Sequence, residues 1–277
     1  MIEPNSAASL SALLSAAARA AHELVDRPPH LLQDPDARAL CALFEPSPLS
    51  YQLAQPEQPV LATARISTAA RAGFARAALE RSGLTQLVLL GAGLDSSVSR
   101  GFEIDTWVVD RPEVLAWRAE LFGQAGITDA AHPVPADLAA DDLLPALAAA
   151  GLDVTRPVFV AALGLVMYLT DGDLQALLGR LAPLPGGSRL VVDSIVPAAL
   201  RDQAGRAYAD AITGSIGGRE PWHCTPHPDQ LAGWLQDAGW RPEQLPIEAD
   251  WVPEPFWAAN PQLGRNRLSV LVEAVRC

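Results

Sequence analysis

The stretch LTQLVLLGAGLDSSVSRGFEIDTWVVDRP, residues 84–112, decides how the rest of the chain is interpreted. Residues 85–90 form a short, almost wholly apolar run, which predicts a strand buried on both faces of a parallel sheet. Gly91-Ala92-Gly93 interrupts that run, and Asp95-Ser96-Ser97 offers helix-capping side chains directly afterwards. The order strand, glycine turn and helix is therefore expected.

A second apolar run, residues 104–109, ends in Asp110, and Pro112 suits the first turn of another helix. Strand, glycine turn, helix, strand and terminal acid are typical of a nucleotide-binding half-unit. In such a unit the glycines let the backbone approach a ligand and the acid accepts hydrogen bonds from ribose hydroxyls. A dinucleotide site calls for a third glycine at the position of Ser96. We therefore favour a nucleoside methyl donor over NAD, which stays an alternative.

The composition limits the class of protein and its partners. The chain has 277 residues, is 49% hydrophobic and carries 32 Asp and Glu against 20 basic residues, for a net charge of −12. This acidity argues against nucleic acid as a partner. Every basic residue is arginine, which excludes a Schiff-base or P-loop lysine. The three cysteines lack metal-ligand spacing, so no metal is expected.

The chain shows no run of apolar residues long enough to cross a bilayer and no signal-peptide pattern. We therefore expect a cytoplasmic protein with no membrane partner. A homodimer stays open, because the sequence does not reveal the oligomeric state.

The segments on either side of residues 84–112 predict a helical preface followed by alternating strands and helices. Such alternation favours a parallel, doubly wound sheet. The preface has expected helices over 6–25, 34–44 and 60–82, with a Pro-rich stretch over 46–59. The later expected elements are helices over 112–125, 140–150, 171–181, 197–211 and 229–238, and strands over 132–135, 157–162, 189–193, 240–247 and 268–275.

We interpret residues 1–277 as a single domain. Residues 1–83 form a helical annex and residues 84–193 the ligand-binding core. Residues 194–228, which include the glycine-rich segment Gly214–Gly218, are a candidate lid because they interrupt the alternation after the fifth strand. Residues 229–277 supply the closing helix and strands.

Five segments of this chain, in order, carry a family resemblance: LVLLGAGLDSS (87–97), FEIDTWVVDRPEVL (102–115), VPADLAADDLLPAL (134–147), ALGLVMYLTDGDLQALLGRL (162–181) and PGGSRLVVDS (185–194). Together they resemble the family that includes leucine carboxyl methyltransferases and tetracenomycin-type polyketide O-methyltransferases. The resemblance covers roughly residues 60–195. It implies a class I methyltransferase fold, Rossmann-like, with a mostly parallel seven-stranded sheet and S-adenosylmethionine as the methyl donor.

By position, the resemblance implies several donor-binding residues. Gly91 and Gly93 would pass under the methionine part, and Asp110 would take the ribose hydroxyls. Asp137 and Leu138 would border the adenine. Arg71 would pair with the donor's carboxylate, for which a guanidinium fork is well suited, with Arg65 as the alternative.

The chain departs from the family pattern at Leu163, where a Glu beside the donor's amino-acid end is typical. Weaker donor binding or altered chemistry would follow from that change. Some members of the wider family use the donor pocket without methyl transfer, so a non-methylating enzyme of the same fold is one alternative. A ligand-binding protein with a vestigial pocket is another.

The candidates for the chemistry itself lie farther along the chain. Tyr168 follows the fourth expected strand, at the edge where open α/β sheets bind ligands. His223 and His227 lie in the candidate lid, where either is a candidate general base or a helix cap. Pro226 and Pro228 argue against a helical metal motif built from this pair. Candidate walls for an aromatic substrate are Trp222, Trp251 and Trp257.

The sequence therefore predicts an S-adenosylmethionine-dependent O-methyltransferase. Its acceptor is expected to be a carboxylate or phenolic hydroxyl of a small, polyketide-like natural product.

Overall fold

Strand β1 (Gln86–Leu90) lies in the interior of the sheet and is buried at every residue, as its apolar run predicts. The computed structural model, which describes residues 7–215 and 221–277, pairs β1 in parallel with β2 (Asp105–Asp110) and with β4 (Phe159–Ala162). Val88 is in register with Trp107 on one side and with Val160 on the other.

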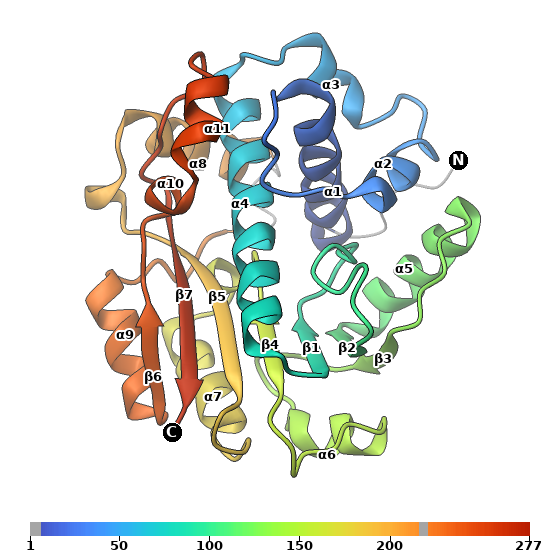
Figure 1. Cartoon of the computed structure of the whole chain (residues 1–277), viewed down its shortest axis with the longest axis vertical. Helices are drawn as coiled ribbons and strands as arrows, with labels where there is room; N and C mark the ends of the chain where they lie inside the picture. The colour runs from blue at the N-terminus through green and yellow to red at the C-terminus, as the bar shows by residue number, and fades with distance from the viewer. Residues whose placement is uncertain (1–6, 216–220) are drawn as a thin grey trace.

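The sheet has seven strands in the order β3-β2-β1-β4-β5-β7-β6 (Figure 1). Strand β7 runs antiparallel to both of its neighbours, whereas β1 to β5 are mutually parallel. The predicted fold class is confirmed. The remaining strands are β3 (His132–Pro135), β5 (Arg189–Ile195), β6 (Trp240–Gln244) and β7 (Ser269–Arg276).

Helices cover both faces of the sheet because its central strands alternate their side chains between two cores. Val88 and Leu90 join one core with α6 (Leu143–Ala149), α7 (Asp171–Leu181) and α9 (Pro228–Asp237). Leu87 and Leu89 join the other with α4 (Pro59–Ser82) and α5 (Pro112–Ala125). This is the doubly wound arrangement.

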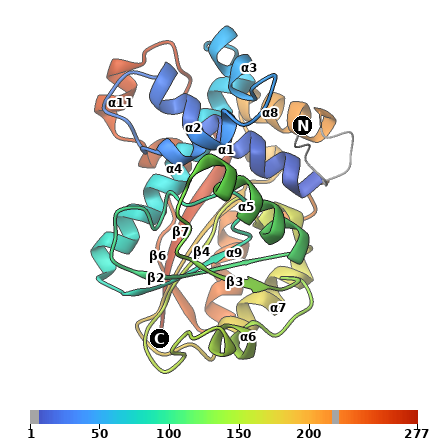
Figure 2. The same cartoon turned by 90° about the vertical axis from the view of Figure 1, so that its right-hand side faces the viewer.

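The N-terminal helices gather over the end of the sheet where the parallel strands finish (Figures 1 and 2). They are α1 (Ala7–Val25), α2 (Pro35–Cys41) and α3 (Leu49–Ala54). Helix α3 falls within the Pro-rich stretch for which no helix was expected. The sixth expected strand ends at Gln244 rather than at residue 247, and two short helices, α10 (Glu248–Trp251) and α11 (Glu254–Ala259), form in the loop expected after it. Within the described residues, no helix has the length and apolar character needed to cross a membrane.

The helix expected after the glycine turn does not form, and residues 94–101 are built of turns instead. Backbone carbonyl groups there accept hydrogen bonds from arginines rather than from helical N–H groups. Arg118 donates to the carbonyls of Gly93 and Asp95, at 3.0 and 2.8 Å. The other donors are Arg19, to the carbonyl of Leu94, and Arg76, to those of Ser97 and Arg100. Guanidinium groups brought from α1, α4 and α5 thus meet the hydrogen-bonding needs of this segment.

The segment after β5 begins with a short 3₁₀ turn, η2 (Ala198–Leu200), and continues as α8 (Gln203–Ser215). Helix α8 packs against α4, so this insertion contacts the N-terminal annex. Most of the glycine-rich segment Gly214–Gly218 lies outside the described residues, as does residue 6 of the first expected helix. The role of the insertion as a lid stays a prediction.

Replacing Arg118 by Met should lower the free energy of unfolding by about 3 kcal/mol, because two loop carbonyls and Asp129 lose a buried guanidinium partner. Methionine keeps an apolar stem of similar length but loses the guanidinium, which lies 4.2 Å from the centroid of the Phe122 ring. Urea denaturation measures the difference. The matched control is Arg38→Met, an exposed arginine of α2 for which we expect no change beyond ~0.5 kcal/mol. Equal stability of the two variants would show that the arginines do not hold this loop.

Candidate active site

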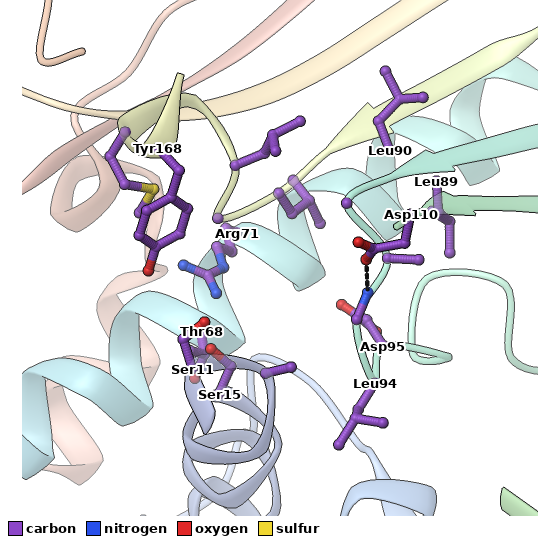
Figure 3. Close-up of a pocket in the computed structure, with 18 of the residues that line it drawn as sticks. Ser11, Ser15, Thr68, Arg71, Leu89, Leu90, Leu94, Asp95, Asp110 and Tyr168 are labelled. Atoms are coloured by element: carbon purple, nitrogen blue, oxygen red, sulfur yellow. Dashed lines mark hydrogen bonds between the residues drawn. The ribbon is translucent and has the colours of Figure 1, made fainter. Parts of the chain in front are cut away.

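One pocket lies at the carboxyl ends of β1 and β4, enclosed by α1, α4, α8 and the loops that follow the parallel strands. Figure 3 shows Arg71 and Tyr168 on one side of the pocket and Asp110 on the other, with Ser11, Ser15 and Thr68 near the annex. The position agrees with the rule that open α/β sheets bind ligands outside the carboxyl ends of their strands.

The glycine turn forms one end of this pocket and is held by Asp110. The Gly93 N–H donates to Oδ2 of Asp110 at 2.8 Å (Figure 3). The Arg111 N–H donates to Oδ1 at 2.8 Å. Burial raises the pKa of Asp110, and the two N–H donors act in the opposite direction. Each carboxylate oxygen keeps a further lone pair, so Asp110 can accept hydrogen bonds from hydroxyl groups of a ligand while it holds the turn.

Gly93 meets two demands that exclude other residues. Its φ of 49° is in the left-handed region, and a Cβ at this position would lie 3.1 Å from the Cβ of Ala12. Helix α1 therefore packs directly on the glycine turn, and the annex forms part of the pocket.

Asp137 and Leu138 also line the pocket, beyond the end of β3. Leu138 is buried and Asp137 is exposed. Oδ1 of Asp137 accepts the Ala139 N–H at 3.0 Å, which orders the loop and leaves Oδ2 available. An apolar surface beside an accepting oxygen suits the edge of a purine ring.

The structure distinguishes between the two arginines considered for the donor's carboxylate. Arg65 is fully buried and donates to Asp26, Gln52 and the carbonyl of Pro56, outside the pocket. Arg71, six residues farther along α4, lines the pocket, with Nη1 3.7 Å from Oδ2 of Asp193. Leu163 and Gly164 lie beside it. Of these two arginines, Arg71 is therefore the one that a ligand in the pocket can reach.

The end of the pocket farthest from Asp137 is apolar and aromatic. The short turn η1 (Val166–Tyr168) contributes Met167 and Tyr168, and α8 contributes Tyr208. Trp222 lies beside Tyr208, with ring centroids 6.5 Å apart. Burial raises the pKa of Tyr208 to about 12, so its hydroxyl is protonated at neutral pH.

His223 and His227 do not line this pocket. His227 caps α9, with its Nδ1 accepting the Asp229 N–H, and about half of its side chain is exposed. The backbone N–H of His223 donates to the carbonyl of Met167, but the residue is exposed. The helix-cap alternative therefore describes His227, and we do not assign a catalytic role to either histidine. Of the tryptophans considered as pocket walls, Trp222 lines the pocket, whereas Trp251 and Trp257 pack in a core with α4.

Several pocket residues were not predicted from the sequence. Tyr208 lies in the insertion, where the family resemblance ends. Ser11 and Ser15 lie on α1, and Thr68 on α4 (Figure 3). The spacing of four residues between the two serines, on an otherwise Ala-rich helix, was the available signal, because residues four apart share a helix face.

Comparisons with known proteins agree with this geometry. The family model for leucine carboxyl methyltransferase matches residues 12–182. A Frankia alni protein, provisionally named an S-adenosyl-L-methionine-dependent methyltransferase, is 34% identical over 175 residues, which cover 60% of this chain and 57% of the relative. A similarly named protein of Mycolicibacterium paratuberculosis is 32% identical over 246 residues, covering 83% of this chain and 79% of the relative. The chain thus spans little more than half the length of the first of these relatives.

The fold is also shared with a solved structure, a provisionally named methyltransferase from Thermobifida fusca. It superimposes with a TM-score of 0.58 at 18% identity, covering 86% of this chain and 92% of the other. The matched family region contains the glycine turn, Asp110, Asp137 and Leu163. The chain belongs to the leucine carboxyl methyltransferase family of S-adenosylmethionine-dependent methyltransferases.

Proposed function

We propose that this protein is an S-adenosylmethionine-dependent O-methyltransferase that acts on a small molecule. The observation that carries the proposal is the continuity of the pocket. Its glycine turn, Asp110 and Asp137 suit a nucleoside, and the same cavity continues past Arg71 to the aromatic end formed by Tyr168, Tyr208 and Trp222. On this proposal residues 84–193 hold the donor together with Arg71 of the annex, and the annex and the insertion after β5 enclose the acceptor.

The residues present fit the donor. Asp110 offers accepting oxygens for the ribose, and Asp137 with Leu138 offers an apolar edge and an acceptor for the adenine. The backbone at Gly91 and Gly93 leaves room for the chain between ribose and amino acid, and Arg71 faces the carboxylate. When bound, the donor supplies an electrophilic methyl group on a sulfonium.

The work of the protein in such a transfer is alignment and exclusion of water. Fixing two reactants in line can lower a barrier by about 7–11 kcal/mol. On this proposal Tyr168 and Tyr208 lie where an acceptor oxygen meets the methyl group, and their rings, with Trp222 and Met167, form a largely apolar wall around it. Because burial keeps Tyr208 protonated, its hydroxyl can orient an anionic oxygen by donating a hydrogen bond.

Two acceptor classes suit this end of the pocket. A carboxylate is ionised at neutral pH and needs no base. A phenol has the flat ring that the aromatic wall accommodates, but it must lose its proton during the transfer. We therefore propose a carboxylate or phenolic hydroxyl on an aromatic, polyketide-like small molecule.

The product distinguishes the two acceptor classes. The protein would be incubated with S-adenosylmethionine labelled in the methyl group and a panel of small aromatic acids and phenols. Mild base hydrolyses a labelled methyl ester and releases the label as methanol, whereas a labelled aryl methyl ether keeps its label.

The rival with an observation in its favour is a non-methylating enzyme of the same fold. Leu163 places an apolar side chain in the pocket next to Arg71, where the family resemblance implies a carboxylate. Tight binding of S-adenosylmethionine without a labelled product from any acceptor would favour this rival. Failure to bind either S-adenosylmethionine or S-adenosylhomocysteine would contradict the main proposal.

Replacing Asp110 by Ala should weaken binding of S-adenosylhomocysteine by about 100-fold or more, since the ribose and the Gly93 N–H lose a charged acceptor together. Isothermal titration calorimetry measures the affinity. Asp105→Ala is the matched control, because Asp105 is an exposed residue at the other end of the same strand. Wild-type affinity in the Asp110 variant would refute the ribose assignment.

Replacing Tyr168 by Phe should lower the rate of methyl transfer by about tenfold and leave the affinity for S-adenosylhomocysteine unchanged, because the lost hydroxyl faces the acceptor and not the nucleoside. The matched control is Tyr51→Phe, which changes a tyrosine of α3 that is 68% exposed. An equal loss of donor affinity would instead place Tyr168 at the donor end of the pocket.

A further inference from the structure

Arg71 differs from the other arginines buried around the pocket in how its hydrogen-bond donors are used. Arg19, Arg65 and Arg118 each donate to a carboxylate and to at least one backbone carbonyl. Within the described residues Arg71 makes no hydrogen bond, and its single ion pair is with Asp193. Its side chain is 14% exposed, toward the pocket (Figure 3). A guanidinium with five donors is therefore available to a ligand.

Asp193 lies on β5, 122 residues beyond Arg71, and is 1% exposed. Its Oδ1 accepts the Gly164 N–H at 2.5 Å. Its Oδ2 has no hydrogen-bond partner among the described residues and lies 3.7 Å from Nη1 of Arg71. That separation is too long for a hydrogen bond but short for a charge pair in a poorly solvated place. Burial raises the pKa of Asp193, and the nearby Arg71 guanidinium and the Gly164 N–H act in the opposite direction. In its ionised form Asp193 attracts Arg71 without occupying its donors.

Gly164 leaves room for the Arg71 guanidinium because it has no side chain. Its φ of 66° is in the left-handed region, and a Cβ there would lie 2.8 Å from Nη2 of Arg71. The same Asp193 carboxylate thus fixes the Gly164 backbone by a hydrogen bond and holds the arginine against it by charge. Glu248, the other buried carboxylate nearby, is directed elsewhere, because its Oε2 accepts from the hydroxyls of Ser67 and Ser269.

We propose that Asp193 is a positioning residue for the methyl donor: from beneath the pocket it holds the fork of Arg71 toward the carboxylate of the donor's amino-acid end. The inference rests on the proposed function, because it assigns Arg71 to that carboxylate. Leu163, which follows β4, offers no charge at this end of the pocket. Asp193 lies on the neighbouring strand β5 and supplies the counter-charge to Arg71.

Two nucleosides separate this role from a general structural one. S-adenosylhomocysteine carries the amino-acid chain, and 5′-methylthioadenosine has the same adenosine part without it. Asp193→Asn and Asp193→Ser should each weaken binding of S-adenosylhomocysteine by about tenfold or more and change binding of 5′-methylthioadenosine by less than about twofold. Calorimetry measures both affinities, and thermal unfolding confirms that each variant is folded. Either substitution alone is sufficient if the other does not fold.

A double-mutant cycle tests whether Asp193 acts through Arg71. Arg71→Ala should also weaken S-adenosylhomocysteine selectively, and adding Asp193→Asn should weaken it by no more than about a further twofold. Ser194→Ala is the control on the same strand, since its buried hydroxyl has no hydrogen-bond partner among the described residues.

The outcomes separate the inference from the function on which it rests. Equal losses for both nucleosides, additive effects in the cycle, or no loss in the Asp193 variants would overturn the role of Asp193 and leave the proposed function standing. A wild-type protein that binds neither nucleoside would overturn the proposed function itself.

Discussion

The hydrogen bond between the Gly93 N–H and the Asp110 carboxylate is the contact on which the site depends. It joins the ends of two neighbouring parallel strands and sets the backbone over which a nucleoside can lie. The carbonyl of Gly93 is held in turn by Arg118, and α1 packs against the Gly93 Cα. The turn is therefore fixed from three directions, by β2, α5 and the annex. A site that is held in place before the ligand arrives loses less conformational entropy on binding.

Arginine has two roles in this acidic, lysine-free chain. Arg19, Arg76 and Arg118 replace helical hydrogen bonds for the loop after the glycine turn, which is why that loop holds its shape without a helix. The guanidinium N–H groups of Arg71 are available to a ligand in the pocket, and the buried carboxylate of Asp193 pairs with the charge of Arg71. The planar fork of arginine suits both roles, because one group can bridge two carbonyls or grip a carboxylate with two parallel bonds.

The features set by local pattern were predictable from the sequence. The apolar run before Gly91, the acid that ends β2 and the alternation of strands and helices each follow from a short stretch of chain, and the predicted fold is confirmed. The prediction of a helix after the glycine turn was wrong. The capping residues are visible in the local sequence, but the distant arginines that donate hydrogen bonds to the carbonyl groups of this loop are not. Tyr208 and Asp193 were missed for a related reason. Tyr208 reaches the pocket from α8, where nothing in the neighbouring sequence indicates a ligand. Asp193 lies in the fifth family segment, but its link to the site is Arg71, which is 122 residues earlier in the chain and not visible in the local pattern.

A crystal structure with bound S-adenosylhomocysteine tests the central claim most directly, because it shows both ends of the ligand at once. We expect the ribose hydroxyls within hydrogen-bonding distance of Asp110, the adenine beside Asp137 and Leu138, and the carboxylate on Arg71. The sulfur should face Tyr168. A ligand bound in the opposite direction, with its adenine at the aromatic end, or one bound outside this pocket, would contradict the assignment of donor and acceptor ends.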